Sequence, residues 1–365
     1  MRAISTLLIF IIIPIVLSGC GGGGGGNEQA SNGVQFNQTY VTSGLAGEVM
    51  TYSFNTADTG NRQYTNSVTY SAYGLGTSPD SGALSPNANG SFSAQLASPR
   101  TTSATVLAVQ NRYITGSVNL PFVKNGAAVS RDTPFIGFAN PSQSDIFLGN
   151  TQNSPIYYNF IAVRCTSKSY GVIGPSSGCA STIGTLKLET ISIGYPDYLF
   201  CEGSNLASGA CAQSTRQGKL SHVGNGIWQF LDSNNNAINV YLMLSQAQNG
   251  QKVGVIDFGE AGGFGFGTAI LTEQQSADAS TPAGTYFFVD TSASTGFLTI
   301  DSSGSFNGSA LVANAPWTGF LRHGPPTVND IANENYVLAS GSGVLAYRDR
   351  SSSAFAFKMG IRKTN

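Results

Sequence analysis

The chain has 365 residues, of which 41% are hydrophobic and only 10% are charged, and its formal net charge is −1. This length is sufficient to bury a large core in one large domain or two moderate ones. The charged fraction lies well below the roughly 25% of typical soluble domains. The sequence also has no cluster of Lys and Arg, which argues against a nucleic-acid-binding surface.

The first 19 residues have the features of a secretory signal. Arg2 precedes an apolar run from Leu7 to Leu17, "LLIFIIIPIVL", which Pro14 interrupts. The run is shorter than the roughly 20 residues that span a bilayer, so we interpret residues 1–19 as a signal peptide. After Cys20 the sequence has no other apolar segment of spanning length.

The signal ends in Leu17-Ser18-Gly19-Cys20, which resembles the lipobox of bacterial lipoproteins. The resemblance implies cleavage before Cys20, a diacylglyceryl group on its sulfur and a further acyl chain such as palmitate on its amine. Several acyl chains anchor a protein durably, whereas one chain binds only marginally. Gly21 rather than Asp follows the cysteine, which favours the outer membrane, with the body facing the periplasm or the cell surface. An ordinary signal peptide with an incidental cysteine is the alternative.

Residues 20–33 are expected to form a flexible tether. Six glycines, Gly21 to Gly26, are followed by the polar stretch "NEQASNG". A Gly-rich coil of this length would hold the folded body on the order of 20 Å from the membrane. Without Arg2, the mature chain has 17 basic and 19 acidic residues and a net charge of −2.

The remainder of the chain predicts an all-β fold. Apolar residues alternate with polar or small ones in "SVTYSAYG" (67–74), "NVYLMLS" (239–245) and "SSAFAFKMGI" (352–361). Residues 284–312 predict a meander with strands around 286–289, 297–300 and 305–311, separated by turn residues. Only "TEQQSADAS" (272–280) and "NDIANENYVLA" (329–339) look weakly helical. The pattern indicates an antiparallel meander, sandwich or barrel-like architecture with disulfide-closed loops.

A division into two β regions is predicted near the polar segment Asn140 to Pro155. An N-terminal β region would cover residues 34–145, and a cysteine-bearing C-terminal region would cover residues 155–365. A single continuous β-fold is the alternative, since large all-β domains reach 200–250 residues.

Four cysteines follow Cys20, and an even number in an oxidising compartment indicates disulfides. Three pairings are open. We favour Cys165–Cys179 and Cys201–Cys211, because each pair brackets a loop-like stretch. A zinc site is the competing interpretation, but no C-x-x-C pair is present and neither histidine is nearby in the sequence. No metal or other cofactor is therefore expected.

The same half of the chain shows a low-specificity family resemblance. The order "YYNFIAVRC", "GTLKLE", "YLFC" and "GNGIWQF" resembles a group of uncharacterised proteobacterial lipoproteins with a Gly/Tyr-rich β-meander and paired cysteines. No activity is assigned to that group, so the resemblance implies a fold and a location but no chemistry.

Three motifs suggest chemistry but lack its structural context. "GPSSG" (174–178) matches G-x-S-x-G with Ser176 as nucleophile, but no helix pattern follows and the segment lies within the Cys165–Cys179 loop. "DSNNN" places Asp232, Asn234 and Asn236 as in a calcium loop, but Ala237 stands where such a loop needs Gly, and a β-turn is the preferred explanation. "GEAGGFGFG" (259–267) lacks the lysine of a P-loop. No catalytic residue is predicted, and the chain is not expected to be an enzyme.

Isolated His222 and His323 are interpreted as structural residues. In "WTGFLRHGPP", Trp317, Arg322 and His323 place aromatic and cationic groups on an expected loop, which is a candidate ligand-contact region.

The preferred functional interpretation is a lipid-anchored envelope lipoprotein with a non-catalytic binding or structural role. A glycan- or lipid-binding module is the alternative, and a Ser176-dependent hydrolase is the least favoured. The expected partners are the membrane, through the lipid, and an envelope protein, a glycan or a small molecule whose identity the sequence does not specify.

Overall fold

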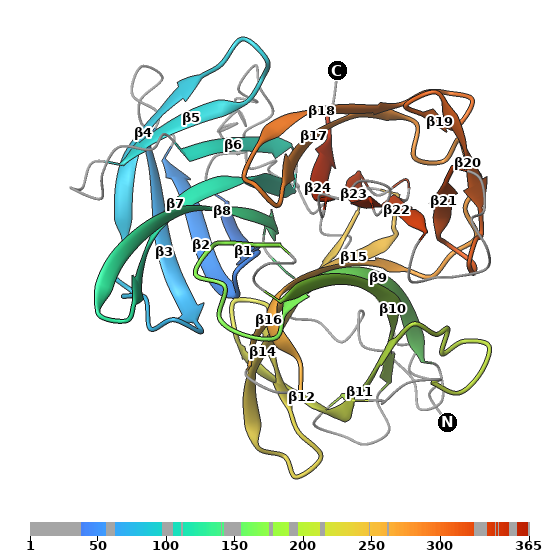
Figure 1. Ribbon diagram of the computed structural model, residues 1–365, viewed down its shortest axis with the longest axis horizontal. Coiled ribbons are helices and arrows are strands. Elements are labelled where there is room, and N and C mark those ends of the chain that lie inside the picture. The colour runs from blue at the N-terminus through green and yellow to red at the C-terminus, as the bar shows by residue number, and fades with distance from the viewer. Residues whose placement is uncertain are drawn as a thin grey trace, which may run out of the picture.

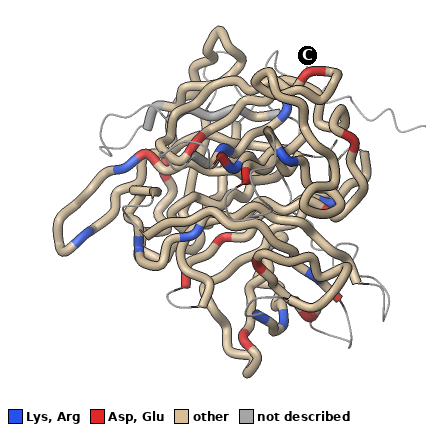
Figure 2. The backbone as a smooth tube through the Cα atoms, turned by 45° about the vertical axis from the view of Figure 1, so that its right-hand side comes forward, with Lys and Arg blue, Asp and Glu red and all other residues tan. Residues whose placement is uncertain are grey.

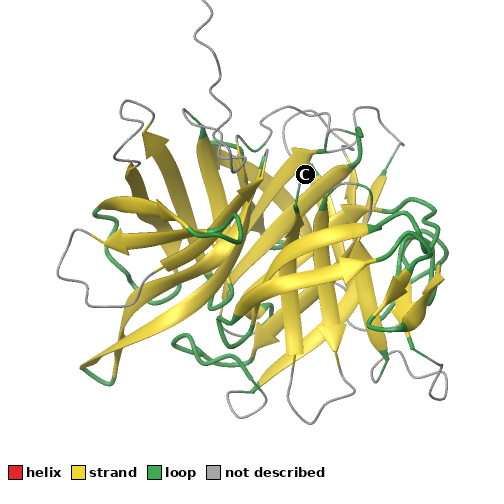
Figure 3. Cartoon of the chain, turned by 90° about the horizontal axis from the view of Figure 1, so that it is seen from above, coloured by secondary structure: helices red, strands yellow, loops and turns green. Residues whose placement is uncertain are grey.

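The computed structural model describes residues 38–363 except 56–62, 97–104, 111, 140, 142–154, 175–177, 190–195, 212–215, 248, 261–262, 325–333, 340, 342 and 350–355. Within this part the chain forms strands β1 to β24 and no helix (Figures 1 and 3). Consecutive strands pair antiparallel, and the strands close into three eight-stranded barrels. The predicted all-β, antiparallel, barrel-like fold is therefore confirmed. The described part also contains no helix able to cross a membrane.

Barrel 1 comprises β1 to β8. Its strands are β1 (Thr39–Gly44), β2 (Glu48–Asn55), β3 (Gln63–Ser71), β4 (Asp80–Pro86), β5 (Phe92–Leu96), β6 (Thr105–Gln110), β7 (Tyr113–Lys124) and β8 (Ala127–Ala139). The barrel closes where β1 pairs with β8.

Barrel 2 comprises β9 to β16. Its strands are β9 (Ile156–Cys165), β10 (Cys179–Glu189), β11 (Asp197–Glu202), β12 (Arg216–Gly224), β13 (Ile227–Leu231), β14 (Ala237–Gln246), β15 (Lys252–Glu260) and β16 (Gly265–Glu273). The barrel closes where β16 pairs with β9.

Barrel 3 comprises β17 to β24. Its strands are β17 (Gly284–Asp290), β18 (Thr295–Ile300), β19 (Ser305–Phe306), β20 (Ser309–Ala313), β21 (Leu321–His323), β22 (Asn335–Ala339), β23 (Val344–Asp349) and β24 (Ala356–Arg362). The barrel closes where β17 pairs with β24. One side is thin, because β18 and β19 share a single register pair, Ile300 with Phe306.

Side-chain alternation gives each barrel its own core. Successive side chains of a strand point to opposite faces of the sheet, so in β17 Tyr286 faces the interior of barrel 3 whereas Phe287 faces outward. Aromatic rings fill the interiors, such as Phe160 stacked on Phe200 in barrel 2, with ring centroids 4.5 Å apart. Eight strands enclose just enough space for side chains, and each buried ring contributes about 1.5–3 kcal/mol.

The outward faces of the closing strands form a fourth core, where the three barrels meet. Val41 and Ile136 of barrel 1, Ile161 of barrel 2 and Phe287 and Val344 of barrel 3 belong to this one cluster. Strands at the junction such as β1, β15 and β16 are therefore buried on both faces, and their buried residues include the polar Thr42, Ser43 and Thr268. Figure 1 shows the barrels grouped around this junction, with barrel 1 blue to teal, barrel 2 green to yellow and barrel 3 orange to red.

The hairpins follow two turn types that the sequence specifies. Asn-Gly pairs at 125–126, 225–226 and 307–308 all have positive φ at both residues, as a type I′ turn requires. Longer turns begin at Asp232, Asp290 and Asp301, where Oδ1 accepts hydrogen bonds from the backbone N–H groups two and four residues later. These aspartates terminate strands by occupying backbone donors within the turn.

Several local expectations can now be compared with the structure. Strands β17 and β18 agree with the predicted meander, but the third stretch is divided into β19 and β20 by the turn at Asn307 and Gly308. The weakly helical interpretation of residues 329–339 is wrong where the structure describes it, because Asn335–Ala339 form β22. Residues 274–280 likewise contain no helix. Barrel 1 falls within residues 34–145, and residues 155–365 contain both barrel 2 and barrel 3.

Two disulfides join the four cysteines that follow Cys20. Cys165 and Cys179 are directly opposite each other on β9 and β10. Cys201, at the end of β11, is joined to Cys211 in the following loop. These are the pairs that the loop spacing favours, and both lie in barrel 2.

Candidate functional site

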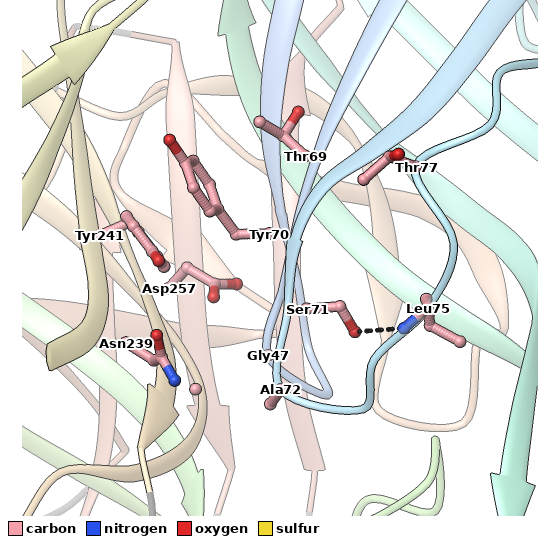
Figure 4. A pocket seen from close by; sticks show the side chains of 11 residues that line it. Gly47, Thr69, Tyr70, Ser71, Ala72, Leu75, Thr77, Asn239, Tyr241 and Asp257 are labelled. Atoms are coloured by element: carbon pink, nitrogen blue, oxygen red, sulfur yellow. Dashed lines mark hydrogen bonds between the residues drawn. The ribbon is translucent and has the colours of Figure 1, made fainter.

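A polar cleft of about 220 Å³ lies between barrel 1 and barrel 2 (Figure 4). Its lining comes from β3 and the following loop on one side and from β14 and β15 on the other. The lining residues are Gly47, Thr69, Tyr70, Ser71, Ala72, Leu75, Thr77, Asn239, Tyr241, Asp257 and Gly259.

The turn between β1 and β2 brings the two barrels together at the base of the cleft. Gly47 in this turn has a φ of +102°, and a Cβ atom there would lie 2.4 Å from the carbonyl oxygen of Phe258 on β15. Only glycine accepts both the conformation and the contact. The local sequence of barrel 1 therefore determines how closely β15 approaches.

A stacked tyrosine pair forms one wall of the cleft. Tyr70 of β3 and Tyr241 of β14 have ring centroids 4.1 Å apart and an interplanar angle of 16°. A register shift between Val49 and Met50 in the β2–β3 ladder lies beside Tyr70, which pairs with Val49. Burial, with smaller contributions from Tyr70 and Asp257, raises the pKa of Tyr241 to about 12. Its phenol therefore stays neutral at physiological pH.

Asp257 is the acidic residue of the cleft lining, and it is almost completely buried. It lies on the outward face of β15, where the Ser43 hydroxyl of barrel 1 donates a hydrogen bond of 2.8 Å to its Oδ2. The Thr268 hydroxyl lies 2.7 Å from Ser43 Oγ. Burial raises the pKa of Asp257 well above its usual range, although the hydrogen bond from Ser43 opposes this shift.

Glu48 follows Gly47 at the start of β2, and its carboxylate lies near Gly44 on the same side as Met50, a residue of the barrel 1 core. Its side chain is fully buried, and neither carboxylate oxygen has a hydrogen-bond partner within the described part of the chain. Burial, reinforced by the nearby charge of Asp257, raises the pKa of Glu48 well above its usual range. Buried acids normally have partners, so the Glu48 carboxyl group is unusual.

No basic residue lines this cleft. Lys168 lies 5.5 Å from the ring of Tyr73, whose hydroxyl donates to the carbonyl of Ala46 beside the β1–β2 turn. Tyr73 and Lys168 are not part of the lining. Figure 2 shows long stretches of backbone that carry no charged residue, so acids such as Asp257 and Glu48 are widely spaced along the chain.

A third acid, Glu202, is largely buried inside barrel 2 and has charged partners. It forms ion pairs with Arg164 and, at 3.3 Å, with Arg216, and the Thr182 hydroxyl donates to it at 2.9 Å. Burial alone would raise the pKa of Glu202, but Arg164, Thr182 and Arg216 together hold it below its usual range. Arg216 also lies 5.0 Å from the ring centroid of Phe264.

The candidate ligand-contact residues do not meet around one cavity. The Trp317 indole packs against the junction of the barrels and donates a hydrogen bond of 2.8 Å to Asn159 Oδ1 of barrel 2. Arg322 and His323 are successive residues of β21 and therefore point to opposite faces. His323 Nε2 lies 3.0 Å from the Phe306 carbonyl, which makes it a hydrogen-bonded residue of the barrel 3 interior.

The other residues considered from the sequence have structural positions or lie outside the described residues. His222 is exposed on β12 beside Trp228. The Asp232 carboxylate is engaged by Asn234 and Asn236 in a hairpin turn. Cys20 and Ser176 lie outside the described residues. In the described part, no three His, Cys, Asp or Glu side chains are grouped as a metal site would require.

Sequence reasoning missed the cleft residues Tyr70, Tyr241 and Asp257 and the buried acid Glu48. A signal was available for two of them. Asp257 interrupts the apolar run "VGVIDFG", and Glu48 stands between "GLAG" and the strand "VMTYSF". An acid within a strand that is apolar on both faces must be buried, and a buried acid requires a partner or a ligand.

Comparison of the chain with protein-family models, with curated proteins and with solved structures finds no match.

Proposed function

We propose that this chain is a lipid-anchored lipoprotein of the bacterial outer membrane whose three-barrel body binds a small ligand and performs no catalysis. The cleft between barrels 1 and 2 carries the binding part of this proposal. It combines an aromatic pair, Tyr70 and Tyr241, with an acid and several neutral polar groups, which is the typical composition of a small-molecule site.

The barrel interiors favour a ligand that binds between barrels. Phe160, Phe200 and Phe258 are fully buried in barrel 2, and Tyr52 and Phe135 stack at 4.9 Å in barrel 1. Side chains thus occupy the space that a larger barrel would offer to a ligand.

The anchoring part of the proposal is supported by the lipobox-like sequence ending at Cys20 and the glycine tether that follows. A non-catalytic role is supported by the positions of His222 and His323, both of which lie away from the cleft lining.

Ligand-observed NMR with the intact mature chain tests the binding function. A library of small neutral and charged metabolites would be screened against the wild type, Tyr70→Ala and the control Tyr157→Ala, a half-buried tyrosine of β9 outside the cleft. We expect at least one compound class to bind the wild type and Tyr157→Ala but not Tyr70→Ala. The absence of any Tyr70-dependent binding would overturn the proposal.

Cell fractionation tests the anchor. The wild type is expected in the outer-membrane fraction and labelled by a palmitate analogue, whereas Cys20→Ala is expected to lose both properties. Protease treatment of intact cells then distinguishes a surface-facing body from a periplasmic one. Unchanged membrane partition of Cys20→Ala would contradict lipid anchoring.

A further inference from the structure

The charge balance of the cleft indicates which ligand it takes. Asp257 is the charged residue of the lining, Glu48 lies close enough to interact with it electrostatically, and the lining contains no Lys, Arg or His. Burying an ionised carboxylate without a positive partner is very costly. The Asp257 carboxyl group therefore holds a proton when no cation is bound, and a bound cation would take the place of that proton.

The geometry leaves one acidic atom available to a ligand. Ser43 donates to Asp257 Oδ2, and nothing in the described part of the chain donates to Oδ1. Figure 4 shows the carboxylate directed into the space between the tyrosine pair and Ser71. An ammonium group placed there would form a charge-assisted hydrogen bond or an ion pair with Oδ1.

The walls complement a cation as well. Tyr70 is half-buried and presents ring surface to the cleft, and tyrosine rings attract cations through their electron-rich faces. Asn239, Thr69 and Thr77 add neutral polar groups around the rim. At about 220 Å³ the cleft is smaller than the roughly 300–1,000 Å³ of sites for drug-sized ligands, which selects a compact ligand.

We infer that the cleft binds a small organic cation, a primary amine or a quaternary ammonium compound, through Asp257 and the tyrosine pair. This inference rests on the proposed binding function of the same cleft.

Matched pairs of cation and neutral isostere test the inference by titration calorimetry and ligand-observed NMR. The probes are choline with 3,3-dimethylbutan-1-ol and ethanolammonium with propan-1-ol, at constant ionic strength. We expect at least one cation to bind the intact mature chain at least tenfold more tightly than its isostere. Binding of both isosteres as tightly as the cations would overturn the inference.

Three variants test which acidic residue is responsible for the preference for cations. Asp257→Asn is expected to weaken cation binding at least tenfold, whereas Glu48→Gln is expected to change it little, because Glu48 does not line the cleft and keeps its proton in the native state. Glu189→Gln is the control, since this acid is paired with Lys187 on barrel 2 and does not line the cleft. If Asp257→Asn does not fold, the isostere comparison on the wild type and on Glu48→Gln still decides the inference.

The outcomes separate this inference from the proposed function. Tyr70-dependent binding of neutral compounds without any preference for cations would overturn the inference and leave the binding function intact. A lack of Tyr70-dependent binding by both cations and neutral compounds would overturn both.

Discussion

Barrel 2 and the junction between barrels 1 and 2 each bury carboxylates, but they treat them in opposite ways. Glu202 in barrel 2 is matched by two guanidinium groups and a hydroxyl. At the junction, Asp257 receives one hydroxyl and Glu48 receives no hydrogen bond within the described residues. The partners of a compensated acid offset the cost of its burial, whereas an uncompensated acid costs stability unless a ligand or a proton neutralises it.

The disulfides are a second difference between barrel 2 and the junction. Cys165 follows Arg164 in β9, and Cys201 precedes Glu202 in β11. Covalent and ionic links therefore act on the same end of barrel 2, whereas the cleft contains neither. We expect barrel 2 to be the rigid half of this comparison and the junction to be the adjustable one.

Breaking the compensated site is predicted to give the largest effect. Arg164→Met removes a principal partner of Glu202 and is expected to lower the free energy of unfolding by about 3–5 kcal/mol, as for other broken buried ion pairs. Urea denaturation measures the change. The double variant Arg164→Met with Glu202→Met should recover much of the loss, and a single variant within about 1 kcal/mol of wild type would contradict the assignment.

Removing the adjacent disulfide is predicted to have the next largest effect. Cys165 and Cys179 are 14 residues apart in the sequence, and closing a loop of this length contributes about 3 kcal/mol in the chain-entropy model. The variant with Cys165→Ser and Cys179→Ser should lose about that amount in urea denaturation. A reducing agent should destabilise the wild type by the contributions of both disulfides. In the variant it should remove only the contribution of the Cys201–Cys211 disulfide.

Substitution of Glu48 is expected to raise the free energy of unfolding, whereas the two changes in barrel 2 are expected to lower it. Since burial raises the pKa of Glu48, the native state retains a proton that the unfolded chain releases above about pH 4. Stability from this group is therefore present at low pH and is lost as pH rises through the raised pKa. Glu48→Gln is expected to increase the free energy of unfolding by about 1–3 kcal/mol at pH 8, with little gain at pH 4.

Denaturation midpoints of Glu48→Gln and wild type at pH 4, 6 and 8 test this sign. Glu202→Gln is the matched control with the opposite expectation, because the lowered pKa of Glu202 gives stability above its ordinary value that is lost as pH falls. A Glu48→Gln variant that is less stable than wild type at pH 8 would show that the carboxylate has a favourable partner.

The smallest change in stability is expected at the Lys187–Glu189 ion pair, which is more exposed than the Arg164–Glu202 pair. Lys187 and Glu189 lie 2.7 Å apart on β10, with side chains 22% and 23% exposed. Such pairs contribute about 0–1 kcal/mol, so Lys187→Met should change the urea midpoint little. A loss comparable with that of Arg164→Met would mean that burial does not distinguish the two pairs.

The sequence was sufficient to predict those features that depend on neighbouring residues. Alternation in residues 67–74 and 284–300 predicted strands that the structure contains, and the spacing around Cys165 and Cys201 favoured the observed pairs. The Asn-Gly pair at 307–308 is a signal for a type I′ turn, but the strand predicted at 305–311 ran across it. Residues 335–339 were misread because a short apolar segment has no decisive period.

The amino-acid sequence by itself indicated that this protein is all-β and favoured the two cysteine pairs that the structure contains. Only the tertiary structure decided that the strands close into three barrels, which strands are buried on both faces and which acids have partners. Ser43 and Asp257 are 214 residues apart, and Tyr70 meets Tyr241 across two barrels. Local patterns specify the strands, but the contacts between barrels are long-range packing outcomes that no local pattern contains.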